Sequence, residues 1–162
     1  MSWRPLRLVD RVQLHTATQQ ELEHLRAVVD RDLKDAALPG LSEDRCFATA
    51  YNAVLQLARM AIACAGYRVS AREGHHQTNF QALELAMGPA VSSLARYLDT
   101  CRRKRNTVDY DLAYRVTGTE AQELMQKARE FQELVETWIA QHQPNLARQT
   151  PSAASSDFVP AP

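Results

Sequence analysis

The chain has 162 residues, 45% of them hydrophobic, and its 19 basic and 19 acidic side chains cancel to a formal net charge of zero. This length and composition predict one globular domain with a substantial core and argue against a second domain. The balanced charge excludes a global field that would draw the protein to nucleic acid or to a membrane, so any anion binding has to be local.

The three cysteines stand at apolar helical positions and lack CxxC spacing: Cys46, Cys64 and Cys101. This pattern predicts buried thiols in a reducing compartment rather than a disulfide or zinc framework. The N-terminal residues contain no continuous apolar stretch of the kind found in signal peptides. We therefore expect a cytoplasmic protein that has neither a metal nor another cofactor.

The N-terminal region divides into an arm and a first helix. Residues 1–15 include several apolar side chains without a decisive period, so they are compatible with a packed arm or with a short strand. Thr18 and Glu21 form a capping-box pattern that begins a helix, and Pro39 stops this helix near Ala37.

The longest predicted helix begins after Ser42, a favourable N-cap residue, and ends at Gly66. It is apolar enough to raise a membrane-spanning interpretation, but polar residues recur along one edge at alternating spacings of four and three: Arg45, Thr49, Asn52, Gln56 and Arg59. This pattern is typical of a central bundle helix with one narrow polar edge, which predicts a dimer seam or a buried hydrogen-bond network. Tyr51 of the same helix is predicted to belong to the core.

Two further helices follow a polar loop over residues 70–77. Thr78, with a glutamine three positions later, predicts the N-cap of a short helix that ends at Gly88. Pro89 suits the first turn of a fourth helix, which continues towards Tyr110.

The last predicted helix is the most clearly amphipathic; Thr119 caps it and Pro144 stops it. From there the composition shifts to proline, serine and alanine, which predicts a disordered tail over residues 144–162. The expected fold is therefore an all-α, up-and-down bundle of about five helices over residues 16–143, preceded by an arm over residues 1–15.

The fourth helix carries an apolar face before its basic end: Val91, Leu94, Leu98 and Cys101. At about 100° per residue, Arg102 and Arg105 continue this face, and such charges must be paired or must line a wet groove. We predict a functional or interface role for these two arginines, with an internal pair between Arg105 and Asp109 as the alternative. Arg103 and Lys104 fit a solvated helix end.

Several motifs occur in order along the chain: Ala50-Tyr51-Asn52-Ala53, Gly66-Tyr67-Arg68, Gly74-His75-His76 and the basic run from Arg102 to Tyr110. With these motifs, residues 42–143 resemble HEPN domains, small helical bundles that are often linked to nucleotidyltransferases, toxin-antitoxin pairs and phage defence. The resemblance implies a HEPN-like bundle that forms a homodimer. It also implies a cleft where the basic motifs of two protomers meet, which many members use for metal-independent RNA cleavage.

The resemblance also implies roles for individual residues. Arg105 and Asn106 match the arginine and the polar residue of the nuclease motif, whereas Tyr110 stands where the motif has a histidine. Arg102 and Arg105 are thus implied to bind phosphate, and Arg105, Asn106 and Tyr110 are the implied catalytic residues. In some nucleotidyltransferase pairs the motif tyrosine carries the attached nucleotide, so Tyr110 is also a candidate for modification; the structural alternative is a hydrogen bond across the bundle.

RNA cleavage through the 2′-hydroxyl needs a base, an acid and positive charge on the transition state. Arginine supplies only the charge, and an unperturbed tyrosine titrates near pH ~10, so Tyr110 is a poor base at neutral pH. His75 and His76 are the candidate acid and base if their loop approaches the cleft. The alternative is that they cap the following helix or face solvent.

These expectations describe a cytoplasmic homodimer, with no membrane association, that binds RNA or nucleotide phosphates in its cleft. In this interpretation it is a ribonuclease-like component of a toxin-antitoxin or defence module. The alternative is a catalytically inactive interaction partner, or modification target, of a nucleotidyltransferase. A helical nucleotide-binding protein without such a partner is the remaining interpretation.

Overall fold

The computed structural model describes residues 2–110 and 116–149, without the side chains of residues 107–110. Within this part of the chain there are six α-helices, two short 3-10 helices and one two-stranded sheet, which confirms an all-α bundle. The helix beyond the expected five is α1, Arg4–Leu8, in the N-terminal arm. Residues 150–162 of the predicted tail lie outside the described residues.

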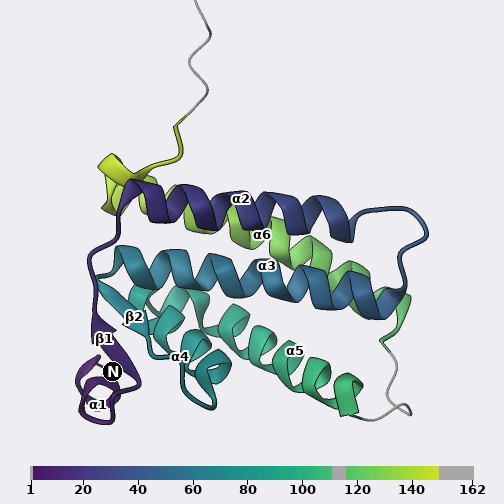
Figure 1. Ribbon diagram of the computed structural model, residues 1–162, viewed down its shortest axis with the longest axis horizontal. Helices are drawn as coiled ribbons and strands as arrows, with labels where there is room; N and C mark the ends of the chain where they lie inside the picture. The colour runs from purple at the N-terminus through teal and green to yellow at the C-terminus, as the bar shows by residue number, and fades with distance from the viewer. Residues whose placement is uncertain (1, 111–115, 150–162) are drawn as a thin grey trace, which may run out of the picture.

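The core forms around α3, Glu43–Cys64, which is buried on most of its sides. Helices α2, Gln19–Ala36, and α6, Gly118–His142, pack against α3, and Figure 1 shows the three helices running together along the long axis of the molecule. Helices α4, His75–Met87, and α5, Ser92–Tyr110, pack against α3 on the side away from α2. The central helix therefore connects both halves of the bundle.

Two helix starts lie where the sequence predicts them. The Thr18 hydroxyl accepts a hydrogen bond from the backbone N–H of Glu21 at 3.2 Å, and the Ser42 hydroxyl accepts one from the N–H of Arg45 at 3.3 Å. The end of α3 is also confirmed, because Gly66 follows the helix with a φ of +94°, a left-handed conformation that glycine adopts without strain.

The start of α6 differs from the prediction by two residues. Thr117, not Thr119, is the N-cap, and it forms a complete capping box with Glu120. The difference has a tertiary cause, since the residue before this cap, Val116, is buried and donates its backbone N–H to Asp44 at 3.1 Å. A cap at Thr117 thus keeps Val116 in the core.

The start of α4 also differs, because the helix begins at His75 rather than after Thr78. Gly74 is the N-cap residue, with a φ of +77°. Thr78 is buried inside the first turn and donates its hydroxyl to the Gly74 carbonyl at 3.2 Å. Both neighbouring histidines therefore belong to a helix, and a 3-10 turn over Pro89–Val91 then leads into α5.

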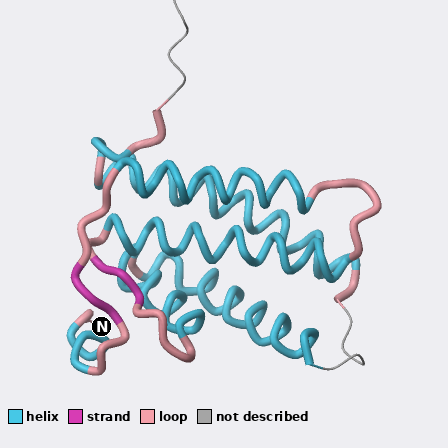
Figure 2. The backbone as a smooth tube through the Cα atoms, in the orientation of Figure 1, coloured by secondary structure: helices cyan, strands magenta, loops and turns pink. Residues whose placement is uncertain are grey.

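The N-terminal arm contains a strand, which settles one alternative that the sequence leaves open. Strand β1, Val12–Leu14, pairs antiparallel with β2, Tyr67–Val69, in the connection between α3 and α4. Figure 2 shows both strands at one end of the bundle. The ring of Trp3 stacks on that of Tyr67 with 4.0 Å between centroids, so the arm is fixed to this connection.

The polar edge of α3 forms a chain of hydrogen bonds, as one of its two interpretations predicts, but the chain is partly buried at Asn52 and Gln56 and exposed at Arg59 rather than buried throughout. Asn52 donates to Asp32 of α2, Gln56 donates to Asn52 at 3.3 Å, and Arg59 donates to Gln56 at 2.9 Å. Arg45 is exposed at the start of the helix. The dimer seam stays a prediction.

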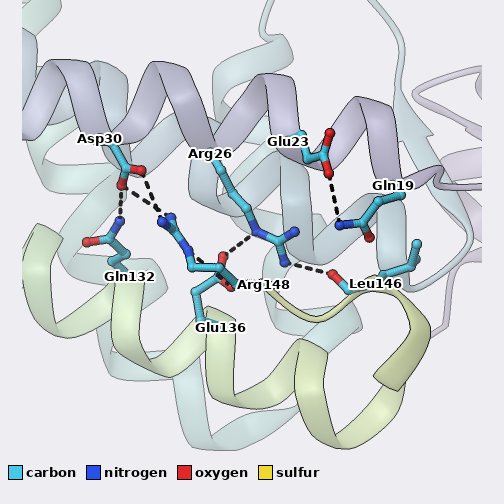
Figure 3. Close-up of polar contacts among 8 residues, drawn as sticks. All are labelled: Gln19, Glu23, Arg26, Asp30, Gln132, Glu136, Leu146 and Arg148. Carbon is cyan, nitrogen blue, oxygen red and sulfur yellow. Dashed lines mark hydrogen bonds and ion pairs between the residues drawn. The ribbon is translucent and has the colours of Figure 1, made fainter. Parts of the chain in front are cut away.

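The first residues of the predicted disordered tail are ordered, which corrects that boundary. Helix α6 ends at His142 before Pro144, as predicted, but the 3-10 turn Pro144–Leu146 and the residues up to 149 pack on the bundle. Figure 3 shows the reason: the buried Arg26 donates to the Leu146 carbonyl at 2.7 Å, and Arg148 pairs with Asp30 at 3.1 Å. These polar contacts act together with the packing of Leu146 against the core.

The three cysteines are buried and free, as predicted. No described helix combines the length and the apolar character that crossing a membrane requires. The described residues also contain no group of three or more histidine, cysteine, aspartate or glutamate side chains placed to hold a metal ion.

Candidate functional site

Helix α5 directs the side chains of its basic run to different surroundings. The side chain of Arg102 is 18% exposed and that of Arg103 is 72% exposed, while Arg105 is partly buried. This contrast follows the helical period, as predicted. Lys104 departs from the prediction of a solvated end, because its Nζ pairs with Glu120 at the start of α6 at 3.1 Å.

Asp99 lies one turn before the basic run and compensates part of its charge. Its two oxygens lie 2.7 Å from Arg102 Nε and 2.9 Å from Arg103 Nη2. Burial alone would raise the pKa of Asp99, but hydrogen bonds from Arg102 and Arg103 outweigh that effect and hold the pKa below its ordinary value. Asp99 is therefore ionised at neutral pH, and it cancels one of the two charges beside it.

A tyrosine and a histidine from two other helices meet close to this run. Tyr51 of α3 is 1% exposed, and its hydroxyl lies 3.0 Å from Nδ1 of His76, in the first turn of α4. Burial raises the pKa of Tyr51 well above its ordinary value, although the charges of Arg105 and Arg102 oppose this effect. The phenol therefore stays protonated, and because His76 is its one hydrogen-bond partner among the described residues, we assign the hydroxyl as the donor and Nδ1 of His76 as the acceptor.

His76 is held in its neutral form. Partial burial, and then the proximity of His75, Arg105 and Arg102, lower its pKa to about 4. Since Nδ1 accepts the proton of the Tyr51 hydroxyl, the neutral ring carries its own proton on Nε2. At neutral pH this imidazole is a hydrogen-bond donor, and its acceptor nitrogen is already occupied.

Arg105 packs against the same tyrosine. Its guanidinium carbon lies 5.2 Å from the centroid of the Tyr51 ring, a distance at which the ring face attracts a cation. Its Nε is buried and has no hydrogen-bond partner among the described residues. We call Tyr51, His76, Arg102 and Arg105, which come from α3, α4 and α5, the arginine–tyrosine cluster.

The other residues predicted for this site lie around the cluster or outside the described part. His75 is exposed, and its Nδ1 lies 3.0 Å from the Arg72 carbonyl, as expected of a histidine in solvent at a helix start. Asn106 is exposed on α5, one residue beyond Arg105. The side chains of Tyr110 and Asp109 lie outside the described residues, and with them the predicted Arg105 to Asp109 pair.

A groove of about 360 Å³ runs between α4 and α5 beside the cluster. Gln77, the neighbour of His76, lines it together with Gln81 on the α4 side. Arg96 and Arg103 line it on the α5 side. Two carboxylates, Glu84 and Asp99, also line the groove, so its amide and guanidinium groups stand beside an equal number of acidic and basic side chains.

Sequence reasoning placed Tyr51 in the core but missed that its hydroxyl belongs to the site. The available signal was physical: a buried tyrosine hydroxyl needs a hydrogen-bond partner, and His76 supplies it. The sequence also favoured solvent or a helix cap for both histidines. That interpretation is right for His75 and wrong for His76, because His76 hydrogen-bonds a residue of α3, whereas His75 lies against the Arg72 carbonyl.

Comparisons of the chain with protein-family models, with curated proteins and with solved structures found no match. The HEPN resemblance therefore stays an expectation that the motifs carry. What the cluster does has to be argued from its own charges, contacts and burial.

Proposed function

We propose that the chain binds RNA through backbone phosphates at the arginine–tyrosine cluster. The observation that carries the proposal is Arg105, a partly buried cation that packs on Tyr51 and makes no ion pair among the described residues. Withdrawing a charge from water without a partner is unfavourable. An anionic ligand removes that penalty, and a phosphate matches the planar guanidinium best.

The groove between α4 and α5 favours a polynucleotide over a single nucleotide. A mononucleotide fills one site, whereas a longer chain also reaches Arg96 and Arg103 in the groove, where Glu84 and Asp99 offset part of their charge. The amides of Gln77 and Gln81 add donors and acceptors for the sugar or the bases. The neutral His76 contributes an Nε2 donor without adding charge.

A second copy of the chain completes the proposed surface. Among the described groups, Asp99 offsets the charge of Arg102, so one protomer offers little excess positive charge at this site. The affinity of a protein for nucleic acid grows with the number of phosphates that it contacts. We therefore propose a homodimer in which two clusters face one RNA, the arrangement that the HEPN resemblance implies.

The chemistry of the cluster supports binding more strongly than cleavage. A histidine that acts as a general base needs a free acceptor nitrogen and a pKa close to the working pH. His76 has a lowered pKa, and its Nδ1 already accepts from Tyr51, while the raised pKa of Tyr51 keeps the phenol protonated. A ribonuclease-like function in a toxin-antitoxin or defence module would need a further base, and the side chain of Tyr110 lies outside the described residues.

The test is binding of a fluorescent single-stranded RNA of about 12 nucleotides, measured by anisotropy over a range of salt concentrations. Arg105→Gln should raise the Kd about tenfold and reduce the salt dependence by roughly one phosphate contact. The matched control is Arg7→Gln, which removes the same charge from the exposed face of α1, at the opposite end of the molecule from the C-terminal end of α5 (Figure 1). The control variant should bind like the unmodified chain.

Two results would contradict the proposal. One is the absence of binding at low salt by the unmodified chain; the other is an equal loss of affinity in both variants, which would show only a general charge effect. In either case the nucleotidyltransferase partner becomes the better interpretation. Mass spectrometry of Tyr110 after co-expression with such an enzyme tests it.

A further inference from the structure

A separate pocket of about 240 Å³ lies where the start of α2, the second half of α3, β2 and the start of α4 meet. Leu25 of α2 and Leu55 and Ile62 of α3 form an apolar wall. Nothing in the proposed RNA site accounts for this pocket, because none of its lining residues belongs to the arginine–tyrosine cluster.

Two arginines from different elements line the pocket. Arg59 of α3 donates to the amide oxygen of Gln56 at 2.9 Å, and Arg68 of β2 donates to that of Gln13 at 3.2 Å. An amide orients a guanidinium but does not neutralise it. Among the described residues, neither arginine makes an ion pair, so both retain their full positive charge.

The acidic charge at the pocket is smaller. Among the described residues that line it, Glu21 is the one carboxylate, and its Oε2 already lies 2.8 Å from Nε2 of His15. Leaving the two histidines out of the count, two guanidinium groups stand against one carboxylate. The excess of one positive charge fits a ligand with a single negative charge.

Two buried acceptor atoms in the lining residues also have no partner. Asn79 is 3% exposed and donates its Nδ2 to the His75 carbonyl at 2.8 Å, which fixes the orientation of its amide. Its Oδ1 is buried and has no partner among the described residues, and the same holds for Oγ of Ser70. Buried polar atoms without partners are rare, because each costs the free energy of a lost hydrogen bond.

We propose that this pocket binds a small organic anion of the 2-hydroxy acid class, with an apolar body. Arg59 and Arg68 hold the carboxylate, and the wall formed by Leu25, Leu55 and Ile62 covers the body. The hydroxyl beside the carboxylate donates to an acceptor that is otherwise unpaired. An apolar pocket with a few convergent polar groups is the usual form of a small-molecule site.

The pocket and the arginine–tyrosine cluster are neighbours with separate cations. His75 lines the pocket and His76 belongs to the cluster, and their rings meet edge to face with 4.4 Å between centroids. The two sites therefore share the first turn of α4 but no arginine. Variants at one site are consequently able to test it without removing a cation from the other.

The experiment titrates the full chain with three probes of nearly equal shape and follows amide chemical shifts by NMR. 2-Hydroxyisocaproate has the acid, the hydroxyl and the apolar body; isocaproate lacks the hydroxyl, and isocaproamide lacks the charge. We expect saturable binding of the hydroxy acid with shifts around Asn79 and Arg68. Isocaproate should bind about tenfold more weakly, and isocaproamide more weakly still.

The variants Arg59→Gln and Arg68→Gln should each raise the Kd of the hydroxy acid about tenfold. Arg129→Gln is the matched control, because Arg129 is exposed on α6 and does not line the pocket; its Kd should not change. Arg59 and Arg68 are exposed, so unchanged melting temperatures should accompany the loss of binding.

Three outcomes overturn the proposal. The first is no saturable shift with the hydroxy acid up to about 10 mM, above the Kd expected for so few contacts. The second is unchanged binding in a variant that carries both arginine substitutions. The third is equal binding of isocaproamide, which would make the pocket an apolar cavity without a role for charge.

Discussion

Arg26 and Arg105 are both shielded from solvent to some degree, but they differ in whether an acidic side chain among the described residues compensates their charge. Arg26 is 5% exposed; its Nε lies 2.9 Å from Glu136, and its Nη2 donates to the Leu146 carbonyl, although Nη1 has no partner among the described residues. Arg105 packs on the ring of Tyr51 and makes no ion pair within the described residues.

The difference teaches how to separate a structural arginine from a functional one in this bundle. The contacts of Arg26 join α2, α6 and the segment after α6, as Figure 3 shows, and Glu136 compensates the charge of Arg26 without a ligand. Among the described residues no acidic group compensates the charge of Arg105, so an anion that binds there is expected to stabilise it most. Removing Arg26 should therefore affect stability, and removing Arg105 should affect the proposed RNA binding.

The largest expected effect is on stability. Arg26→Ala leaves the carboxylate of Glu136 partly buried without its closest partner, and it should lower the free energy of unfolding by about 3 kcal/mol. Urea unfolding followed by circular dichroism measures this loss.

Arg105→Ala is the matched comparison for that experiment. It removes a cation–π contact and leaves no acid of the described residues unpaired, so the loss should be about 1 kcal/mol or less. Equal losses in the two variants would break the distinction between the two arginines.

A smaller effect is expected from pH, because the cluster keeps His76 neutral. Its pKa is about 4 in the folded chain, against an ordinary value of 6.5, so between these values the unfolded chain binds the proton and the folded chain does not. The contribution of His76 to stability is complete above pH 6.5 and is lost as the pH falls towards 4. We expect a loss of about 2 kcal/mol, allowing for solvent screening of the partly exposed ring.

The variant His76→Gln isolates the contribution of His76 to the pH dependence of stability, since glutamine accepts the Tyr51 hydroxyl proton but does not titrate. In urea unfolding at several pH values, the free energy of unfolding should decrease less for the variant than for the unmodified chain as the pH falls. Parallel pH profiles for the two proteins would argue against a neutral His76 in the folded chain.

The smallest effect tests the segment that completes the surroundings of Arg26. A chain that ends at residue 143 loses the Leu146 carbonyl and the ion pair of Arg148 with Asp30, which should cost about 1 kcal/mol in urea unfolding. A chain that ends at residue 149 keeps both contacts and is the control. If both truncations behave alike, the segment does not support Arg26.

The helix boundaries that the sequence predicts correctly are those with local causes. Thr18 and Ser42 cap their helices through a backbone group three residues away, so the necessary information lies within one turn. The α6 cap moves to Thr117 because Val116 binds Asp44, which lies far away in the sequence. Strand β2 was missed for a similar reason, since three residues make a strand only when β1 pairs with them.

The candidate site divides in the same way. Helical periodicity alone predicts that Arg102 leaves solvent while Arg103 stays in it. The pairing of Tyr51 with His76 depends on how α3 and α4 pack, which no local pattern contains. The resemblance to HEPN domains directed attention to the basic run and to the histidine pair, but it did not distinguish His76 from His75.

The stacking of Trp3 on Tyr67 has a practical consequence. Tyr67 also lines the pocket with Arg59 and Arg68, so one of the two indoles of the chain contacts a wall of that pocket. Indole emission shifts in wavelength when its surroundings change in polarity. With Trp138 replaced by phenylalanine, the indole emission comes from Trp3 alone. It then reports on the contact between the arm and the pocket.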